Sequence, residues 1–156
     1  MYIRGERSAE VWPSVVSAGW KDELRGGERL EVFGQRDDPR LVALDSAIDF
    51  IQLIGMANIE TRTRRLATLL KQELGRVPGV KLKTNMEPEL SGGVIKALVG
   101  SGPQKPIYDA LWDKYRVSTS LTPTGDSAGI RFSPHIYNTV EEVMKVAEAV
   151  KGVSAA

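Results

Sequence analysis

The sequence has no cysteine in its 156 residues. This absence excludes disulfides, cysteine-ligated zinc or iron–sulfur sites and a cysteine nucleophile within the chain. Only one histidine is present, His135, so no pair of histidines can ligate a metal ion. We interpret His135, which lies in a Pro-His-Ile turn, as a structural hydrogen-bonding residue. We expect neither a metal site nor a catalytic residue in this chain.

The sequence also has little excess charge of either sign, because 21 lysines and arginines face 20 aspartates and glutamates. No strong general field is therefore available to attract nucleic acid or an anionic membrane. No apolar run approaches the roughly 20 residues that a membrane-spanning helix needs, and charge begins at Arg4, too early for a signal peptide. We predict a cytoplasmic protein with no nucleic-acid partner and no membrane partner.

The first half of the chain contains the pattern of two long helices, over residues 37–75. Asp37-Asp38-Pro39 is typical of a helix start, since aspartate caps free amides and proline lacks one. Apolar residues then recur on one face, at Leu41, Leu44, Ile48 and Ile51. After Gly55 a second helical pattern runs to Leu74, and Gly75 suits its end.

The second half changes period and predicts four short strands with two further helices. Alternating or β-branched runs indicate strands over residues 80–83, 94–99, 117–121 and 130–133. Helical patterns cover residues 106–115 and the segment from Thr139 to about Gly152, where Thr139 and Glu142 have the spacing of a capping box. We predict an α+β fold: two long helices, then a small, mostly antiparallel sheet covered on one face by helices.

The segment most informative about function is Gly129-Ile130-Arg131-Phe132-Ser133-Pro134-His135-Ile136-Tyr137-Asn138-Thr139. An arginine at the end of a strand, before a turn and a capped helix, is placed to hold a planar carboxylate through two parallel hydrogen bonds. Arginine on a strand is more often a surface residue or a structural ion-pair partner, so the residues alone leave both interpretations open.

This segment resembles the closing part of class V aminotransferases, which are pyridoxal phosphate enzymes with an R-x-S-x-x-x-Y-N-T-x-E-E pattern. The matching residues are Arg131, Ser133, Tyr137, Asn138, Thr139, Glu141 and Glu142. The resemblance implies that Arg131 binds the carboxylate of a small amino acid substrate. It also implies a homodimer with sites at the subunit boundary.

The resemblance extends over nearly the whole chain and implies a division into parts. Residues 1–36 would be the end of a large cofactor domain, 37–75 bridging helices, 76–153 a small C-terminal α+β domain and 154–156 a tail. Met1-Tyr2-Ile3-Arg4 resembles the family's L-Y-V-R segment, which follows closely on the lysine that forms the Schiff base. That lysine would then lie before Met1, so we expect no covalent pyridoxal phosphate on this chain. We interpret each lysine present as lying on a solvated helix face, a strand edge or a loop.

A second stretch, around Gly34 and Gln35, aligns with the family's G-T-R-D motif, whose threonine reaches the cofactor phosphate of the partner subunit. Gln35 replaces that threonine, and its amide can still donate a hydrogen bond to phosphate. The resemblance therefore implies that Gly34 and Gln35 bind the cofactor, whereas the residues alone also fit a loop before a helix cap.

We derive two functional hypotheses. In the first, the chain is the C-terminal segment of a class V aminotransferase-like enzyme, inactive alone, that binds the carboxylate of its amino acid substrate. The missing cysteine favours an aminotransferase or epimerase-like branch over the desulfurases, which place a nucleophilic cysteine before the carboxylate-binding arginine. In the second, the chain is a stand-alone, non-catalytic α+β binding or interaction domain.

Overall fold

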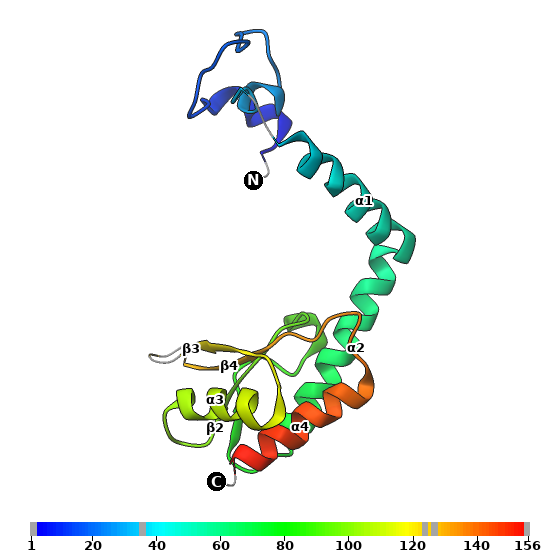
Figure 1. The fold of residues 1–156 in the computed structure, drawn as a ribbon, viewed down its shortest axis with the longest axis vertical. Coiled ribbons are helices and arrows are strands. Elements are labelled where there is room, and N and C mark those ends of the chain that lie inside the picture. The colour runs from blue at the N-terminus through cyan, green and yellow to red at the C-terminus, as the bar shows by residue number, and fades with distance from the viewer. Residues whose placement is uncertain (1–2, 35–36, 123–124, 126–127, 155–156) are drawn as a thin grey trace. The chain divides into compact units, whose positions relative to one another are not determined.

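The computed structural model describes residues 3–34, 37–122, 125 and 128–154 (Figure 1). The chain divides into two compact units, Met1–Phe50 and Ile51–Ala156, and the boundary falls inside helix α1 (Asp38–Ile54). The domain boundaries implied by the family resemblance stay a prediction.

The N-terminal unit begins with irregular structure that contains two short 3-10 helices, Gly5–Glu10 and Glu28–Leu30. Between them Trp12 and Trp20 lie with ring centroids 5.2 Å apart. The Arg29 guanidinium lies 5.2 Å from the first ring centroid and 5.4 Å from the second, and the Trp20 indole N–H donates to the Arg29 carbonyl at 3.1 Å. This cation–π cluster connects two turns of a segment that has little other packing.

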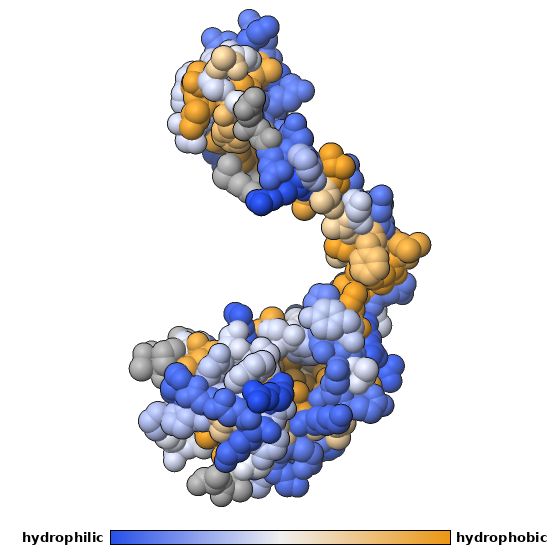
Figure 2. Space-filling view, viewed as in Figure 1, coloured by the Kyte–Doolittle hydropathy of each residue, from blue (hydrophilic) through white to orange (hydrophobic). Residues whose placement is uncertain are grey.

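Helix α1 confirms the first predicted helix, but none of its residues is buried. Its predicted apolar face, Leu41, Leu44, Ile48 and Ile51, is between 41% and 57% exposed. Hydrophobic residues are visible along this helix in Figure 2. The apolar face of α1 is therefore exposed along its length.

The C-terminal unit contains the predicted α+β fold. Its elements in chain order are α2 (Met56–Gly75), β1 (Val80–Leu82), a 3-10 turn (Pro88–Leu90), β2 (Ile95–Val99), α3 (Gln104–Tyr115), β3 (Ser120–Thr122), β4 (Gly129–Phe132) and α4 (Val140–Ser154). The strands form a sheet in the order β1-β2-β4-β3, and all neighbouring pairs are antiparallel.

The hydrophobic core lies between one face of this sheet and the three helices (Figure 1). In β2 alternate residues are buried, namely Ile95, Ala97 and Val99. They share one cluster with apolar residues of the helices, such as Leu66 of α2 and Val143 of α4. Because strand side chains alternate between faces, Lys96 and Arg131 belong to the opposite face, which we call the open face.

The third strand begins three residues later than predicted, at Ser120 instead of at residue 117. Ser120 pairs with Arg131, so residue 117 would have to pair with Pro134. Proline has no amide hydrogen to donate, and β4 already ends at Phe132. The chain before Ser120 therefore has no paired strand beside it, although its composition favours β structure.

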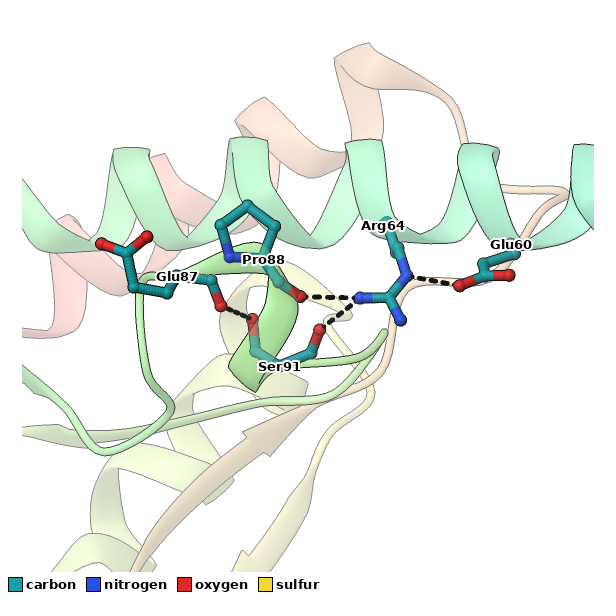
Figure 3. Close-up of polar contacts among 5 residues, drawn as sticks. All are labelled: Glu60, Arg64, Glu87, Pro88 and Ser91. Atoms are coloured by element: carbon teal, nitrogen blue, oxygen red, sulfur yellow. Dashed lines mark hydrogen bonds and ion pairs between the residues drawn. The ribbon is translucent and has the colours of Figure 1, made fainter.

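Arg64 of α2 holds the segment that connects β1 to β2 (Figure 3). Its Nη1 donates to the carbonyls of Pro88 and Ser91, both at 2.7 Å, while its Nε contacts Glu60 at 2.8 Å. The Ser91 hydroxyl in turn donates to the Glu87 carbonyl at 2.9 Å. These contacts hold the turn against α2.

Lys71, two turns further along α2, corrects the interpretation that every lysine is solvated, because its exposed fraction is 0%. Its ammonium group donates to the carbonyls of Asn85 at 3.0 Å and Met86 at 3.1 Å, and to the Ser91 hydroxyl at 2.6 Å. Three acceptors match the three N–H donors of an ammonium group. Lys71 thus ties an exposed turn to the buried side of α2 through its ammonium group.

Candidate functional site

The turn that follows β4 is closed by the predicted capping box. The Thr139 amide donates to the Glu142 carboxylate at 2.9 Å, and the Glu142 amide donates to the Thr139 hydroxyl at 3.1 Å. Asn138 adds to this cap, since its side-chain oxygen accepts from the His135 amide at 2.8 Å and its Nδ2 donates to Glu142 at 3.1 Å. The His135 contact uses the backbone amide, so the structural role that we expected for its side chain stays a prediction.

The same cap changes the acidity of two carboxyl groups. The hydrogen bond from the Thr139 amide, supported by the Asn138 side chain, lowers the pKa of Glu142 below its ordinary value. A hydrogen bond from its own backbone amide, followed by one from the Thr139 hydroxyl, lowers the pKa of Glu141. Both carboxylates are therefore engaged with helix α4, which starts here.

Arg62 attaches this turn to the rest of the fold, because its Nη2 donates to the Asn138 carbonyl at 2.8 Å. The Y-N-T-x-E-E part of the family pattern thus has a structural purpose at most of its positions: Asn138, Thr139 and Glu142 build the cap. Arg131 is the charged residue of the pattern that takes no part in this helix cap among the described contacts.

Arg131 projects from the open face of β4, where it is exposed between the buried residues Ile130 and Phe132. Its Nη2 donates to the Ser120 hydroxyl of β3 at 3.1 Å, which orients the guanidinium. No carboxylate pairs with Arg131 among the residues that the structure describes. Its remaining N–H groups are available to a ligand.

A hollow of about 640 Å³ opens beside Arg131. Hydroxyl groups from the chain before and within β3 line it, at Ser118, Thr119 and Ser120, together with the cationic side chain of Arg116. The Thr119 hydroxyl oxygen is buried there without a hydrogen-bond partner in the described structure. Apolar side chains such as Val143 and Val146 form the rest of the lining, so the hollow offers both hydrogen-bonding groups and apolar surface.

Ser120 is a site residue that the sequence interpretation missed. The run of serine and threonine over residues 117–122 was a signal for it, because every second residue of a strand lies on the same face. The signal could be used only once the register placed Ser120 opposite Arg131.

The second predicted site lies around Gly34 and Gln35. Gly34 has a φ of 89°, a conformation that favours glycine, and it is exposed. Gln35 lies outside the described residues. Cofactor binding by these two residues therefore stays a prediction.

The described residues do not fit pyridoxal phosphate, which needs a lysine for the Schiff base and an acidic partner for its ring nitrogen. Lys145 is the lysine that lines the hollow, and it comes from a solvated face of α4. Glu142 is the carboxylate there, and the helix cap engages it. The described residues that line the hollow thus do not fit the cofactor ring.

No group of three or more histidine, aspartate or glutamate residues lies together in the described ranges as a metal ion would require. No single described helix is long and apolar enough to cross a membrane, and only α1 and α2 taken as a broken pair reach that threshold, by length and composition alone. The expected absence of a membrane partner stays a prediction.

Comparisons of the sequence find curated relatives of much greater length. Isopenicillin N epimerase of Amycolatopsis lactamdurans is 34% identical over 137 residues, which are 87% of this chain and 34% of that protein. Isopenicillin N epimerase of Streptomyces clavuligerus is 30% identical over 130 residues, 83% of this chain and 33% of that protein. The chain therefore spans about a third of the length of these relatives. No protein-family model matches it.

Comparisons of the structure find the same fold in larger proteins. The apo structure of a cysteine desulfurase from Thermococcus onnurineus NA1 matches with a TM-score of 0.85 and 20% identity, over 99% of this chain and 42% of that chain. The cystine C-S lyase C-DES matches with a TM-score of 0.80 and 22% identity, over 96% of this chain and 41% of that chain. Another structure of C-DES matches with a TM-score of 0.76 and 20% identity, over 98% of this chain and 40% of that chain. That structure carries glycine covalently linked to its pyridoxal phosphate cofactor. At these identities the likeness shows a shared fold.

Proposed function

The chain belongs to the class V aminotransferase family of pyridoxal phosphate enzymes, and we propose that its C-terminal unit binds the α-carboxylate of an amino acid substrate through Arg131. The observation that carries this proposal is the state of Arg131. It is exposed on the open face, oriented by Ser120, unpaired among the described residues and next to a hollow.

The chemistry of the guanidinium supports this role. It presents a rigid, planar set of N–H donors that matches both oxygens of a carboxylate, and it stays charged at every physiological pH. The hydrogen bond to Ser120 uses one donor of the Nη2 nitrogen and leaves the others free. Preorganisation by Ser120 lowers the entropy that the side chain loses when a ligand binds.

We further propose that this chain alone does not catalyse a reaction of the cofactor. Pyridoxal phosphate supplies the electron sink for reactions at the α-carbon of amino acids. The described residues offer no suitable lysine–acid pair beside Arg131, so the chain would contribute substrate binding to a site that other residues complete. A stand-alone, non-catalytic binding domain would use the same arginine, and the substrate site alone does not separate the two hypotheses.

The role of Arg131 can be tested by titrating the ¹⁵N-labelled chain with propionate, a monocarboxylate, and following the Arg131 Nε–H and Ser120 amide signals by NMR. We expect saturable shifts at both positions in the parent chain, weaker binding in Arg131→Lys, and none in Arg131→Gln. Arg65→Gln is the matched control, since Arg65 is an exposed arginine of α2 away from the hollow. Equal propionate affinities in the parent and in Arg131→Gln would refute the proposal.

The cofactor proposal has a separate test. The purified chain is mixed with pyridoxal phosphate, reduced with borohydride and analysed by intact mass. We expect no stoichiometric adduct, because no described lysine is placed for one. A single adduct on one lysine would mean that the chain holds the cofactor itself.

A further inference from the structure

A second cation lies beside Arg131 on the open face of the sheet. Lys96 of β2 is the cross-strand partner of Arg131 of β4, so their Cα atoms lie about 5 Å apart. Both residues alternate with buried neighbours, which places both side chains on the face that the helices leave uncovered.

The Lys96 side chain does not extend into solvent at this position. It crosses β4, and its Nζ donates to the Thr122 hydroxyl of β3 at 3.1 Å. Gly129 of β4 makes this path available, because a Cβ at that position would lie 3.4 Å from the Lys96 Cε and 2.8 Å from the Ala97 carbonyl oxygen. The backbone there also has a φ of 146°, which favours glycine.

The two cations are thus held in the same way, each by a hydroxyl of the edge strand β3. Arg131 contacts Ser120, and Lys96 contacts Thr122, two residues further along. Residues two apart in a strand are separated by about 7 Å and point to the same face. The sheet therefore presents two oriented cationic groups along one line.

No negative charge balances this pair within the sheet. The four strands contain no aspartate or glutamate, and among the described residues neither Lys96 nor Arg131 forms an ion pair. Like charges on facing positions of a sheet repel and are unfavourable without a partner. A ligand with two anionic groups would remove this repulsion, whereas a ligand with one would remove only part of it.

We propose that Lys96 binds a second anionic group of the substrate, so that the site selects amino acids whose side chain carries a carboxylate. This inference rests on the proposed role of Arg131, which would hold the α-carboxylate. Lys96 is then a specificity-determining residue, and Thr122 and Gly129 position it.

L-Glutamate and L-glutamine are suitable probes, because they share the α-carboxylate and differ by one negative charge. Binding of each to the chain is measured by NMR titration at constant ionic strength. We expect glutamate to bind about tenfold more tightly than glutamine, the contribution typical of one hydrogen bond between charged groups. We expect Lys96→Gln to remove this preference, so that glutamate and glutamine bind with equal affinity, and Lys96→Arg to retain most of the preference.

Lys81→Gln is the matched control. Lys81 is an exposed lysine of β1 on the open face, paired in register with Leu98 and one row away from Lys96. It should leave the preference for glutamate intact, and the thermal midpoints of all variants should show that the sheet is folded.

The outcomes separate this inference from the function on which it rests. If Arg131→Gln abolishes binding of both amino acids while Lys96→Gln keeps the preference for glutamate, the role of Lys96 is wrong and that of Arg131 stands. If Arg131→Gln changes neither affinity, the proposed function itself is wrong. If inorganic phosphate binds as tightly as glutamate and loses the same affinity in Lys96→Gln, the pair is a general anion site and the inference is overturned.

Discussion

In the turn between β4 and α4, single residues stabilise the start of helix α4. Thr139 satisfies the Glu142 amide at the start of α4. Thr139→Ala removes that acceptor, so we expect the free energy of unfolding to fall by about 1 kcal/mol. Urea unfolding followed by circular dichroism measures the change, and Thr139→Ser should restore most of it because the hydroxyl returns. An unchanged midpoint in Thr139→Ala would show that the cap does not stabilise the helix.

Glu142 gives the same turn a dependence on pH. Hydrogen bonds to its carboxylate lower its pKa below the ordinary value of 4.5 in the folded chain. The unfolded chain therefore binds a proton first as pH falls, and the stabilising contribution is complete above pH 4.5 and is lost as pH falls through the folded pKa.

The prediction is that Glu142→Gln, which cannot titrate, loses less stability than the parent chain between pH 6 and the acid limit of folding. Unfolding midpoints measured across this range for both proteins give the difference directly. Parallel curves for the two proteins would mean that Glu142 titrates equally in the folded and unfolded states.

Among the elements, helix α2 and the β1–β2 connection form a unit that depends on Lys71. Lys71→Met would leave the carbonyls of Asn85 and Met86 and the Ser91 hydroxyl without their donor in a partly buried site. We expect a loss of about 3 kcal/mol in the free energy of unfolding. The exposed Lys114→Met on α3 is the control and should stay within about 0.5 kcal/mol of the parent. Equal losses in both variants would contradict the contacts of Lys71.

The elements also show which features of this fold can be predicted from sequence. The capping box was predicted correctly because Thr139 and Glu142 are three residues apart, so the signal is local. The start of β3 was predicted wrongly because it depends on where its partner strand β4 ends, at Phe132, and on Pro134 beyond that end. The burial of Lys71 was missed for the same reason, since its acceptors lie 14 to 20 residues further along the chain.

In the candidate site, too, some residues could be predicted from neighbouring sequence and others only from strand pairing. The family pattern indicated Arg131 directly, because the pattern itself is continuous in sequence. Ser120 and Lys96 became recognisable only through the register of β4 with its two neighbours. A sheet brings together residues from three strands, and the sequence does not specify that pairing locally.

At the scale of the whole molecule, the main open question of packing concerns helix α1, whose apolar side chains are exposed. Large apolar side chains such as Val42, Phe50 and Leu53 are exposed, the last to 85%. Apolar surface of this extent on a folded chain marks a contact with other protein surface. The chain spans about a third of its curated relatives, so both further residues of such a protein and a second copy of this chain are candidates to cover the helix.

For the chain as it is, we propose that a second copy covers α1, in keeping with the dimer implied by the family. Burying apolar area contributes about 25 cal/mol per Å², and this contribution opposes the entropic cost of association. We predict a concentration-dependent increase in mass by analytical ultracentrifugation. Leu44→Gln combined with Ile48→Gln should shift the chain towards monomer, because both residues belong to the exposed apolar face. Asp45→Asn, a polar change on the same helix, should leave the association unchanged. A parent chain that stays monomeric at every concentration would show that α1 is stable in water without a partner, and its apolar face would then need another explanation.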